Sequence, residues 1–255
     1  MAGLSEIPAD SAIYVEGSGL RRVLMGIDMG VAELVLAKQL GYEAVIAHHL
    51  QPAILSFPKI LDLHIHQMVQ AGVPEPVAIK AVQGLQEALE YRYHSGNYDH
   101  APSVARLLGM PYLSIHNPLD ELGRRIMDEA IQTRLTPEAT VGDVVDALLT
   151  LPEFQAAPTR PLIAVGEPGN PAGKVVVAHG AGTNGGYEVA NAYFEHGVKT
   201  VVYIHCDISH VRRLRQEGKG NLIISGHMVS DLVGINPFVR ELERRGLRVD
   251  RISGL

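Results

Sequence analysis

The stretch RRVLMGIDMGVAELVLAKQLGYEAVIAHH, residues 21–49, sets the fold class because it reads as strand, helix and strand in succession. Residues 31–41 have the apolar spacing of a helix that ends at Gly41, and β-branched or small apolar residues dominate on both sides. Two strands joined by a crossover helix run parallel. Residues 174–207, KVVVAHGAGTNGGYEVANAYFEHGVKTVVYIHCD, repeat the same order, which we interpret as a weak internal duplication.

The repeated unit predicts the fold class and the domain organisation. We expect an α/β protein of two similar, intertwined three-layer units, so that residues 1–255 form a single intertwined body. Its approximate halves are 1–135 and 160–255, and the stretch around 136–159 is the predicted linker. A further strand, helix and closing strand are expected over 221–253.

The composition excludes several classes of function. The 255 residues are 46% apolar and carry a net charge of −6, so the chain can form a core but offers no basic field to nucleic acid. Cys206 is the single cysteine, which rules out an internal disulfide and favours a reducing compartment. No apolar run approaches the roughly 20 residues of a membrane span, and no signal peptide is recognisable. We therefore expect a cytoplasmic protein without a nucleic-acid or membrane partner.

Histidines and aspartates follow four of the predicted strands. The sequences AVIA, YLSI, TVVYI and LIIS each run into such residues. Ligands bind beyond the carboxyl ends of the strands in parallel α/β sheets, so residues far apart in the sequence can meet there. The residues at these four ends are His48, His49, His116, Asp120, His205, Asp207, His227 and Asp231.

The chemistry of these residues favours a metal site. His227 and Asp231 lie four residues apart, which places them on one face if a helix begins there, and His116 and Asp120 repeat the spacing. Neutral imidazoles with carboxylates suit Zn, Fe, Mn, Co or Ni. Two adjacent histidines, a third histidine and two carboxylates exceed one tetrahedral site. They fit two ions about 3.5 to 4 Å apart that share a bridging carboxylate.

A simpler interpretation is that histidines at strand ends are surface residues or ordinary hydrogen-bonding groups, because the chain has 12 of them. For the adjacent pair His48 and His49 both interpretations stay open, since two imidazoles behind a buried strand must each find a partner. The simpler interpretation is preferred for His64, His66, His94, His100, His196 and His210.

Three motifs resemble those of the YbgI-like dinuclear metal-centre family, whose members are also described as GTP cyclohydrolase I type 2 homologues. They are AVIAHH (44–49), HNPLD (116–120) and GHMVSD (226–231), and the resemblance extends from about Arg21 to the C-terminus. It implies two divalent transition-metal ions, a site in the cleft between the two units, and a homo-oligomer, commonly a hexamer. The ligands that it implies are His48, His49, Asp120, His227 and Asp231, with Asp120 as the bridge and His116 as a ligand or supporting residue.

The sequence also departs from the family pattern. The family usually follows the histidine pair with proline, whereas this chain has HHLQP, and its last ligand is usually glutamate where this chain has Asp231. The shorter side chain of aspartate can shift or weaken one metal position. Residues 61–98 are longer than the family requires between its first two motifs. This segment could form a lid or an oligomer contact.

The resemblance implies a metal-dependent hydrolase of the GTP cyclohydrolase I type 2 kind, in which two metal ions activate a bridging water. His116 or Asp207 is the predicted catalytic residue that moves the proton. The expected substrate is a small molecule. Phosphorylated and nucleotide-like compounds are among the candidates. The alternative function is a non-catalytic metal-binding or regulatory module.

A glycine-rich turn supports a third interpretation. Gly180, Gly182 and Gly185 have GxGxxG spacing between a strand and a helix, and Asp207 follows about 22 residues later, as in NAD(P)-binding units. The same turn could instead bind a substrate phosphate at a helix start, or it could serve only close helix packing. Cys206 is interpreted as a small buried apolar residue rather than a nucleophile.

Overall fold

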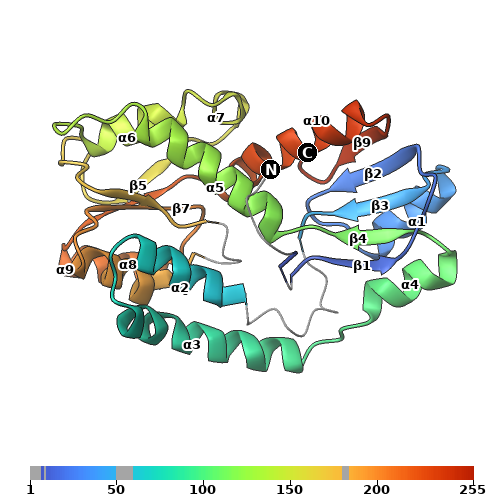
Figure 1. The fold of residues 1–255 in the computed structure, drawn as a ribbon, viewed down its shortest axis with the longest axis horizontal. Coiled ribbons are helices and arrows are strands. Elements are labelled where there is room, and N and C mark those ends of the chain that lie inside the picture. The colour runs from blue at the N-terminus through green and yellow to red at the C-terminus, as the bar shows by residue number, and fades with distance from the viewer. Residues whose placement is uncertain (1–6, 9, 50–59, 180–183) are drawn as a thin grey trace. The chain divides into compact units, whose positions relative to one another are not determined.

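The computed structural model describes residues 7–8, 10–49, 60–179 and 184–255, and it shows an α/β protein of two compact units. The first unit comprises Met1–Ile60, Glu87–Leu119 and Ile235–Leu255, and the second comprises Leu61–Gln86 and Asp120–Gly234. Each unit is assembled from separate stretches of the chain, which confirms the prediction of two intertwined α/β units. Figure 1 shows the helices and strands of both units as a ribbon.

The first unit contains a five-stranded mixed sheet with the order β1-β4-β3-β2-β9. β2 and β3 are parallel, with Val23 opposite Ala44, and α1 connects them as predicted for residues 21–49. β9 and β4 extend the parallel part on either side, and β1 pairs antiparallel with β4. The bounds are β1 Ala12–Val15, β2 Arg22–Gly26, α1 Val31–Gln39, β3 Ala44–Ala47, α4 His100–Leu108, β4 Tyr112–Ser114 and β9 Arg248–Ile252.

Alternate residues of these strands face two separate apolar clusters. Leu24 and Val45 pack with residues of α1 and α4. Val23 and Ile46 lie in the other cluster, which includes Val239 of helix α10 (His227–Arg244). Because successive side chains of a strand point to opposite faces, a sheet that is covered on both faces needs continuous apolar strands. This explains the uninterrupted sequence AVIA of β3, in which every residue is buried.

The second unit contains a four-stranded sheet with the order β5-β8-β7-β6. β6 and β7 are parallel and are connected through α8, which confirms the strand, helix and strand predicted for residues 174–207. β8 continues the parallel part, and β5 pairs antiparallel with it. The bounds are β5 Leu162–Val165, β6 Val175–Val177, α8 Gly186–Glu195, β7 Thr200–Tyr203, α9 Ile208–Glu217 and β8 Asn221–Ile224.

This second sheet also separates two apolar clusters. Val201 and Leu222 pack in one cluster with residues of α8 and α9, and the helix α2 (Leu61–Gln70) contributes Met68 to it. Val202 and Ile223 lie in the other cluster, together with residues of α5 (Asn117–Gln132) and α6 (Val141–Leu148). The alternation along β7 and β8 again follows from the two-residue period of a strand.

The observed division differs from the predicted halves 1–135 and 160–255. The expected linker 136–159 contains α6 and α7 (Pro152–Ala156), whose side chains Val144, Leu148 and Phe154 are fully or almost fully buried in the second unit. Apolar residues at helical spacing here outweigh the prolines that suggested a linker. The boundary between the units instead falls within α3 (Glu75–His94), α5 and α10.

Residues 61–98, predicted as a lid or an oligomer contact, form α2 and α3, and either role stays a prediction. The helices in the described part of the chain include none with the length and apolar character that a membrane crossing requires.

Candidate metal centre

Three histidines of the first unit converge at the carboxyl ends of neighbouring parallel strands. His48 and His49 follow β3 directly, and His116 follows β4. Ala47 of β3 is paired with Ser114 of β4, so the residues that come next emerge at the same edge of the sheet. One ring nitrogen of each histidine lies within 4.8 Å of the others, and the ring centroids are 5.2 to 5.7 Å apart.

The backbone and the Nδ1 atoms hold the histidine pair in place. The amide groups of His48 and His49 donate to the carbonyl oxygens of Gly26 and Ile27, which continues the pairing of β3 with β2. His48 Nδ1 lies 3.1 Å from the carbonyl oxygen of Ile115, and His49 Nδ1 lies 2.7 Å from Asp28 Oδ1. Both rings are therefore oriented by groups at the end of the sheet.

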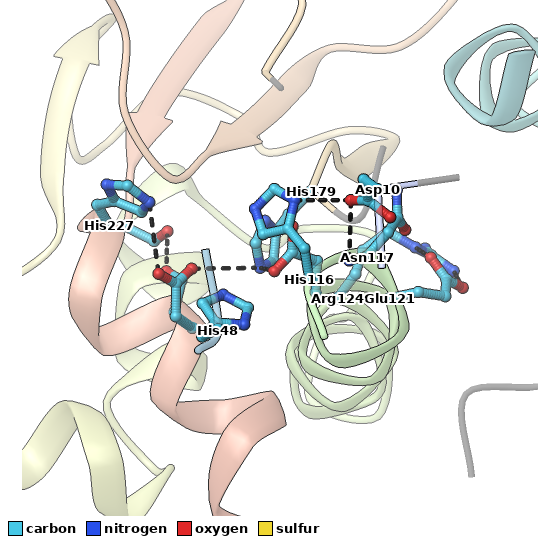
Figure 2. A network of polar contacts seen from close by, with 12 residues as sticks. Asp10, His48, His116, Asn117, Glu121, Arg124, His179 and His227 are labelled. Atoms are coloured by element: carbon cyan, nitrogen blue, oxygen red, sulfur yellow. Dashed lines mark hydrogen bonds and ion pairs between the residues drawn. The ribbon is translucent and has the colours of Figure 1, made fainter. Parts of the chain in front are cut away.

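His116 is held by a carboxylate. Its Nδ1 lies 2.7 Å from Oδ2 of Asp10, and the same oxygen accepts the backbone N–H of Asn117 at 3.1 Å. Figure 2 shows these contacts among the sticks labelled Asp10, His116 and Asn117. Asp10 is fully buried, and Ser11 Oγ accepts the backbone N–H of His116. The chain before β1 is thereby tied to the start of α5.

The second unit carries a cluster of two aspartates and two histidines. Asp120 lies in the first turn of α5 and Asp231 in the first turns of α10, and one oxygen of each lies within 4.8 Å of the other. His179, which comes soon after β6, places its Nε2 3.9 Å from an oxygen of each aspartate. His227 Nε2 lies 3.4 Å from Asp231 Oδ2, four residues along the same helix (Figure 2).

Three of the four residues in this cluster are buried, whereas the side chain of His227 is 41% exposed. Asp120 and Asp231 are 3% and 1% exposed, and His179 is 3% exposed. Removing a carboxylate from water costs on the order of several kcal/mol unless a cation or hydrogen-bond donors compensate. Two carboxylates this close together also repel each other, which increases the cost of keeping both ionised.

The donor atoms of both clusters fit a divalent transition metal. Imidazole nitrogen and carboxylate oxygen bind Zn²⁺ at about 2.0 to 2.2 Å, so atoms that share one ion lie about 3 to 4 Å apart. The separations of 3.4 and 3.9 Å within the second unit have this magnitude. The chemistry of the donors also matches metals that prefer mixed nitrogen and oxygen ligands. The buried histidines and aspartates of these clusters therefore support the interpretation of the chain as a metal-binding protein.

No protein-family model and no curated protein matches the chain. The crystal structure of a NIF3 superfamily protein from Sphaerobacter thermophilus, however, is 56% identical in sequence, with a TM-score of 0.98 over 100% of this chain and 94% of that one. The chain belongs to the NIF3 superfamily. Reduced HcgD from Methanocaldococcus jannaschii shares the fold at 11% identity, with a TM-score of 0.57 over 94% of this chain and 87% of that one.

The YbgI-like resemblance predicted from three motifs is confirmed for this NIF3 superfamily protein. The structure described as protein ybgI, of unknown function, has a TM-score of 0.53 at 15% identity, and the match covers 99% of this chain and 92% of that one. The predicted ligands of the family pattern are His48 and His49 in the first unit and Asp120, His227 and Asp231 in the second. That all five bind the same two ions stays a prediction.

The NIF3 chain also contains site residues that the motifs and spacings did not identify. His179 was overlooked although it follows the strand β6, which is the same signal that identified the other histidines. Asp10 and Asp28 were overlooked because neither stands at a motif spacing from the histidine that it contacts. Only the folded chain brings these carboxylates to His116 and His49.

The glycine-rich turn is only partly described. Gly180 and Gly182 lie outside the described residues, whereas Gly185 stands at the start of α8 with φ +80°. A β-carbon at Gly185 would lie 2.6 Å from Val189 Cβ, which is shorter than a normal contact. Close packing therefore accounts for glycine at this position without a bound phosphate or dinucleotide.

Asp207, predicted as a catalytic residue, caps a helix. It precedes α9, is exposed, and accepts the backbone N–H of Ser209 at 2.7 Å. Hydrogen bonds from the Ser209 side chain and backbone lower the pKa of the Asp207 carboxyl below its usual value. The neighbouring His205 is exposed, with its Nδ1 2.8 Å from Asn184 Nδ2 and its ring centroid 4.9 Å from that of His227. The catalytic role of Asp207 stays a prediction.

Cys206 is expected to react slowly with thiol reagents. It packs against the apolar cluster of α8 and α9, and burial raises the pKa of its thiol from 9.0 to about 11. At neutral pH the reactive thiolate is then about 100-fold less populated than in an ordinary cysteine. Alkylation by iodoacetamide should be slower by about that factor in native protein than in urea. Equal rates would contradict the interpretation of Cys206 as an apolar packing residue.

Proposed function

We propose that this NIF3 superfamily protein binds two divalent transition-metal ions and is a metal-dependent hydrolase of a small molecule. The observation that carries the proposal is the pair of buried carboxylates, Asp120 and Asp231, with His179 Nε2 3.9 Å from each. Such a pair is costly in a protein core unless cations are bound. The first unit by itself brings together three histidines, whose nitrogen atoms are ligands of the type that these metals prefer.

The residues of the chain would have distinct roles in this hydrolase. Divalent ions, when bound, supply Lewis-acid chemistry and make a water molecule acidic enough to act as a nucleophile near pH ~7. Asp120 is the proposed bridging ligand, and Asp231, His48, His49 and His227 complete the proposed ligand set. His116, with Nδ1 held by a carboxylate, has one free role at Nε2: it either binds a metal ion there, as the sixth proposed ligand, or moves a proton there, and it cannot do both at once.

The substrate is proposed from the family resemblance alone. GTP is the first compound to assay, because the resemblance implies a GTP cyclohydrolase I type 2 homologue, and other phosphorylated or nucleotide-like small molecules come next. A homo-oligomer, a hexamer by resemblance, is part of the same proposal, and light scattering of the purified protein measures its mass.

Metal analysis tests the proposal directly. The protein is first stripped of metal with a chelator, then loaded with Zn²⁺, Mn²⁺ or Fe²⁺ and freed of excess metal. Plasma emission spectroscopy should then find about two ions per chain. His48→Ala should lower the content because it removes a ligand, and His94→Ala, at an exposed position of α3, should not. No metal retained in the wild type would contradict the proposal.

Turnover then separates the candidate functions. Hydrolysis that depends on the bound metal and is lost in His48→Ala supports the enzyme. Bound metal without hydrolysis of any nucleotide or phosphorylated compound supports the non-catalytic metal-binding module instead. A rise in melting temperature with NAD in metal-free protein would favour the dinucleotide-binding interpretation.

A further inference from the structure

The geometry points to Asp10 as the positioning residue that makes Nε2 the metal-facing nitrogen of His116. This inference rests on the proposed metal function, but its first consequence, the tautomer of His116, holds in metal-free protein. Asp10 Oδ2 lies 2.7 Å from His116 Nδ1. An ionised carboxylate can only accept hydrogen bonds, so Nδ1 must carry the proton and the lone pair of a neutral ring lies on Nε2.

A backbone donor at the start of a helix favours a carboxylate at Asp10. The backbone N–H of Asn117, the first residue of α5, donates to Asp10 Oδ2 at 3.1 Å. The start of a helix carries N–H groups without partners inside the helix and a partial positive charge, both of which favour a carboxylate. Asp10 is fully buried, so water does not compete for its oxygens. The carboxylate is thereby fixed at one place relative to the His116 ring.

The three converging histidines of the first unit use Nδ1 in the same way. The acceptor is a carbonyl oxygen for His48, an aspartate for His49 and an aspartate for His116. Nε2 is consequently the nitrogen that carries the lone pair when each ring is neutral. Ligating histidines in metalloproteins show the same pattern, in which the second nitrogen donates to a carbonyl or carboxylate.

Asp10 and Asp28 differ in their exposure to water, so the loss of each is expected to affect its histidine to a different extent. The side chain of Asp10 is 0% exposed and that of Asp28, the partner of His49, is 76% exposed. Water can replace Asp28 as an acceptor, but it cannot replace Asp10 in the buried position. We therefore expect the loss of Asp10 to change the orientation and the metal affinity of its histidine more than the loss of Asp28.

Two measurements test the inference on the wild type and on Asp10→Ala, Asp10→Asn and Asp28→Asn. Nitrogen-15 NMR of metal-free protein reports the tautomer of His116, and competition with a chelator gives the affinity for Zn²⁺. The wild type should show the Nδ1–H tautomer of His116, assigned by comparison with His116→Gln. Asp10→Ala should show a mixture of tautomers and about 10- to 100-fold weaker Zn²⁺ binding. Asp28→Asn, the matched control at an exposed carboxylate, should change the affinity by less than about 3-fold.

Asp10→Asn keeps the volume of the side chain and serves if the alanine variant fails to fold. It should also weaken Zn²⁺ binding, because the charge is lost and the amide can donate to Nδ1 and move the ring proton to Nε2. An unchanged His116 tautomer and unchanged affinity in the folded Asp10 variants would overturn the inference. A wild type that shows the Nδ1–H tautomer but binds no Zn²⁺ would instead overturn the proposed function.

Discussion

Replacing Asp231 by asparagine is expected to abolish the thermal stabilisation that divalent metal gives to the wild type. An ion at 100 times its dissociation constant stabilises the folded state by about 2.7 kcal/mol, which corresponds to about 5 to 10 °C in a chain of this size. Asp231 is 1% exposed and contacts both His179 and His227, so an uncharged amide removes a ligand from the centre of the cluster.

The same variant is expected to be no less stable than the wild type when metal is absent. Asparagine has the shape of aspartate but removes one of two buried carboxylates that lie within 4.8 Å of each other. Differential scanning calorimetry with and without Zn²⁺ measures both effects, and Asp62→Asn on the exposed side of α2 is the control. A full metal-dependent shift in Asp231→Asn would contradict the assignment of this residue as a ligand.

Replacing Gly185 by alanine is expected to destabilise the protein by about 2 to 5 kcal/mol. Two terms contribute to the effect. A left-handed backbone, here with φ +80°, costs a residue with a β-carbon about 1 to 2 kcal/mol. The added carbon would also lie 2.6 Å from Val189 Cβ, and overpacking costs about 1 to 3 kcal/mol more.

Gly197 offers a matched control in the same unit. It has φ +89°, but no atom lies within 4 Å of where its β-carbon would be, so Gly197→Ala should cost only the backbone term of about 1 to 2 kcal/mol. The free energy of unfolding from urea titration measures both variants. Equal losses of unfolding free energy in the two variants would contradict packing as the reason for glycine at position 185. They would favour ligand binding at this turn instead.

Local sequence patterns were sufficient to predict the two strand, helix and strand units and the histidines that follow the strands. Periodicity sets the type of element, and parallel strands deliver the residues beyond their carboxyl ends to one edge. His48, His49 and His116 could therefore be named as candidates from these patterns, whereas the choice of metal ligands over ordinary hydrogen-bonding histidines depended on the family resemblance. The three motifs led to the correct family. The linker prediction over 136–159 differs from the structure because prolines in a surface loop and prolines at the start of a packed helix look alike in the sequence.

The order of residues along the chain is enough to predict the α/β class, the parallel units and most of the candidate ligands. These features depend on residues that are close to one another in the sequence. Long-range packing alone places Asp10 against His116, His179 between Asp120 and Asp231, and Val189 against Gly185. Asp10 and His116 are 106 residues apart, and no local period relates them. Such contacts depend on how strands and helices pack, since burial and hydrogen bonding at a site are properties of the whole fold.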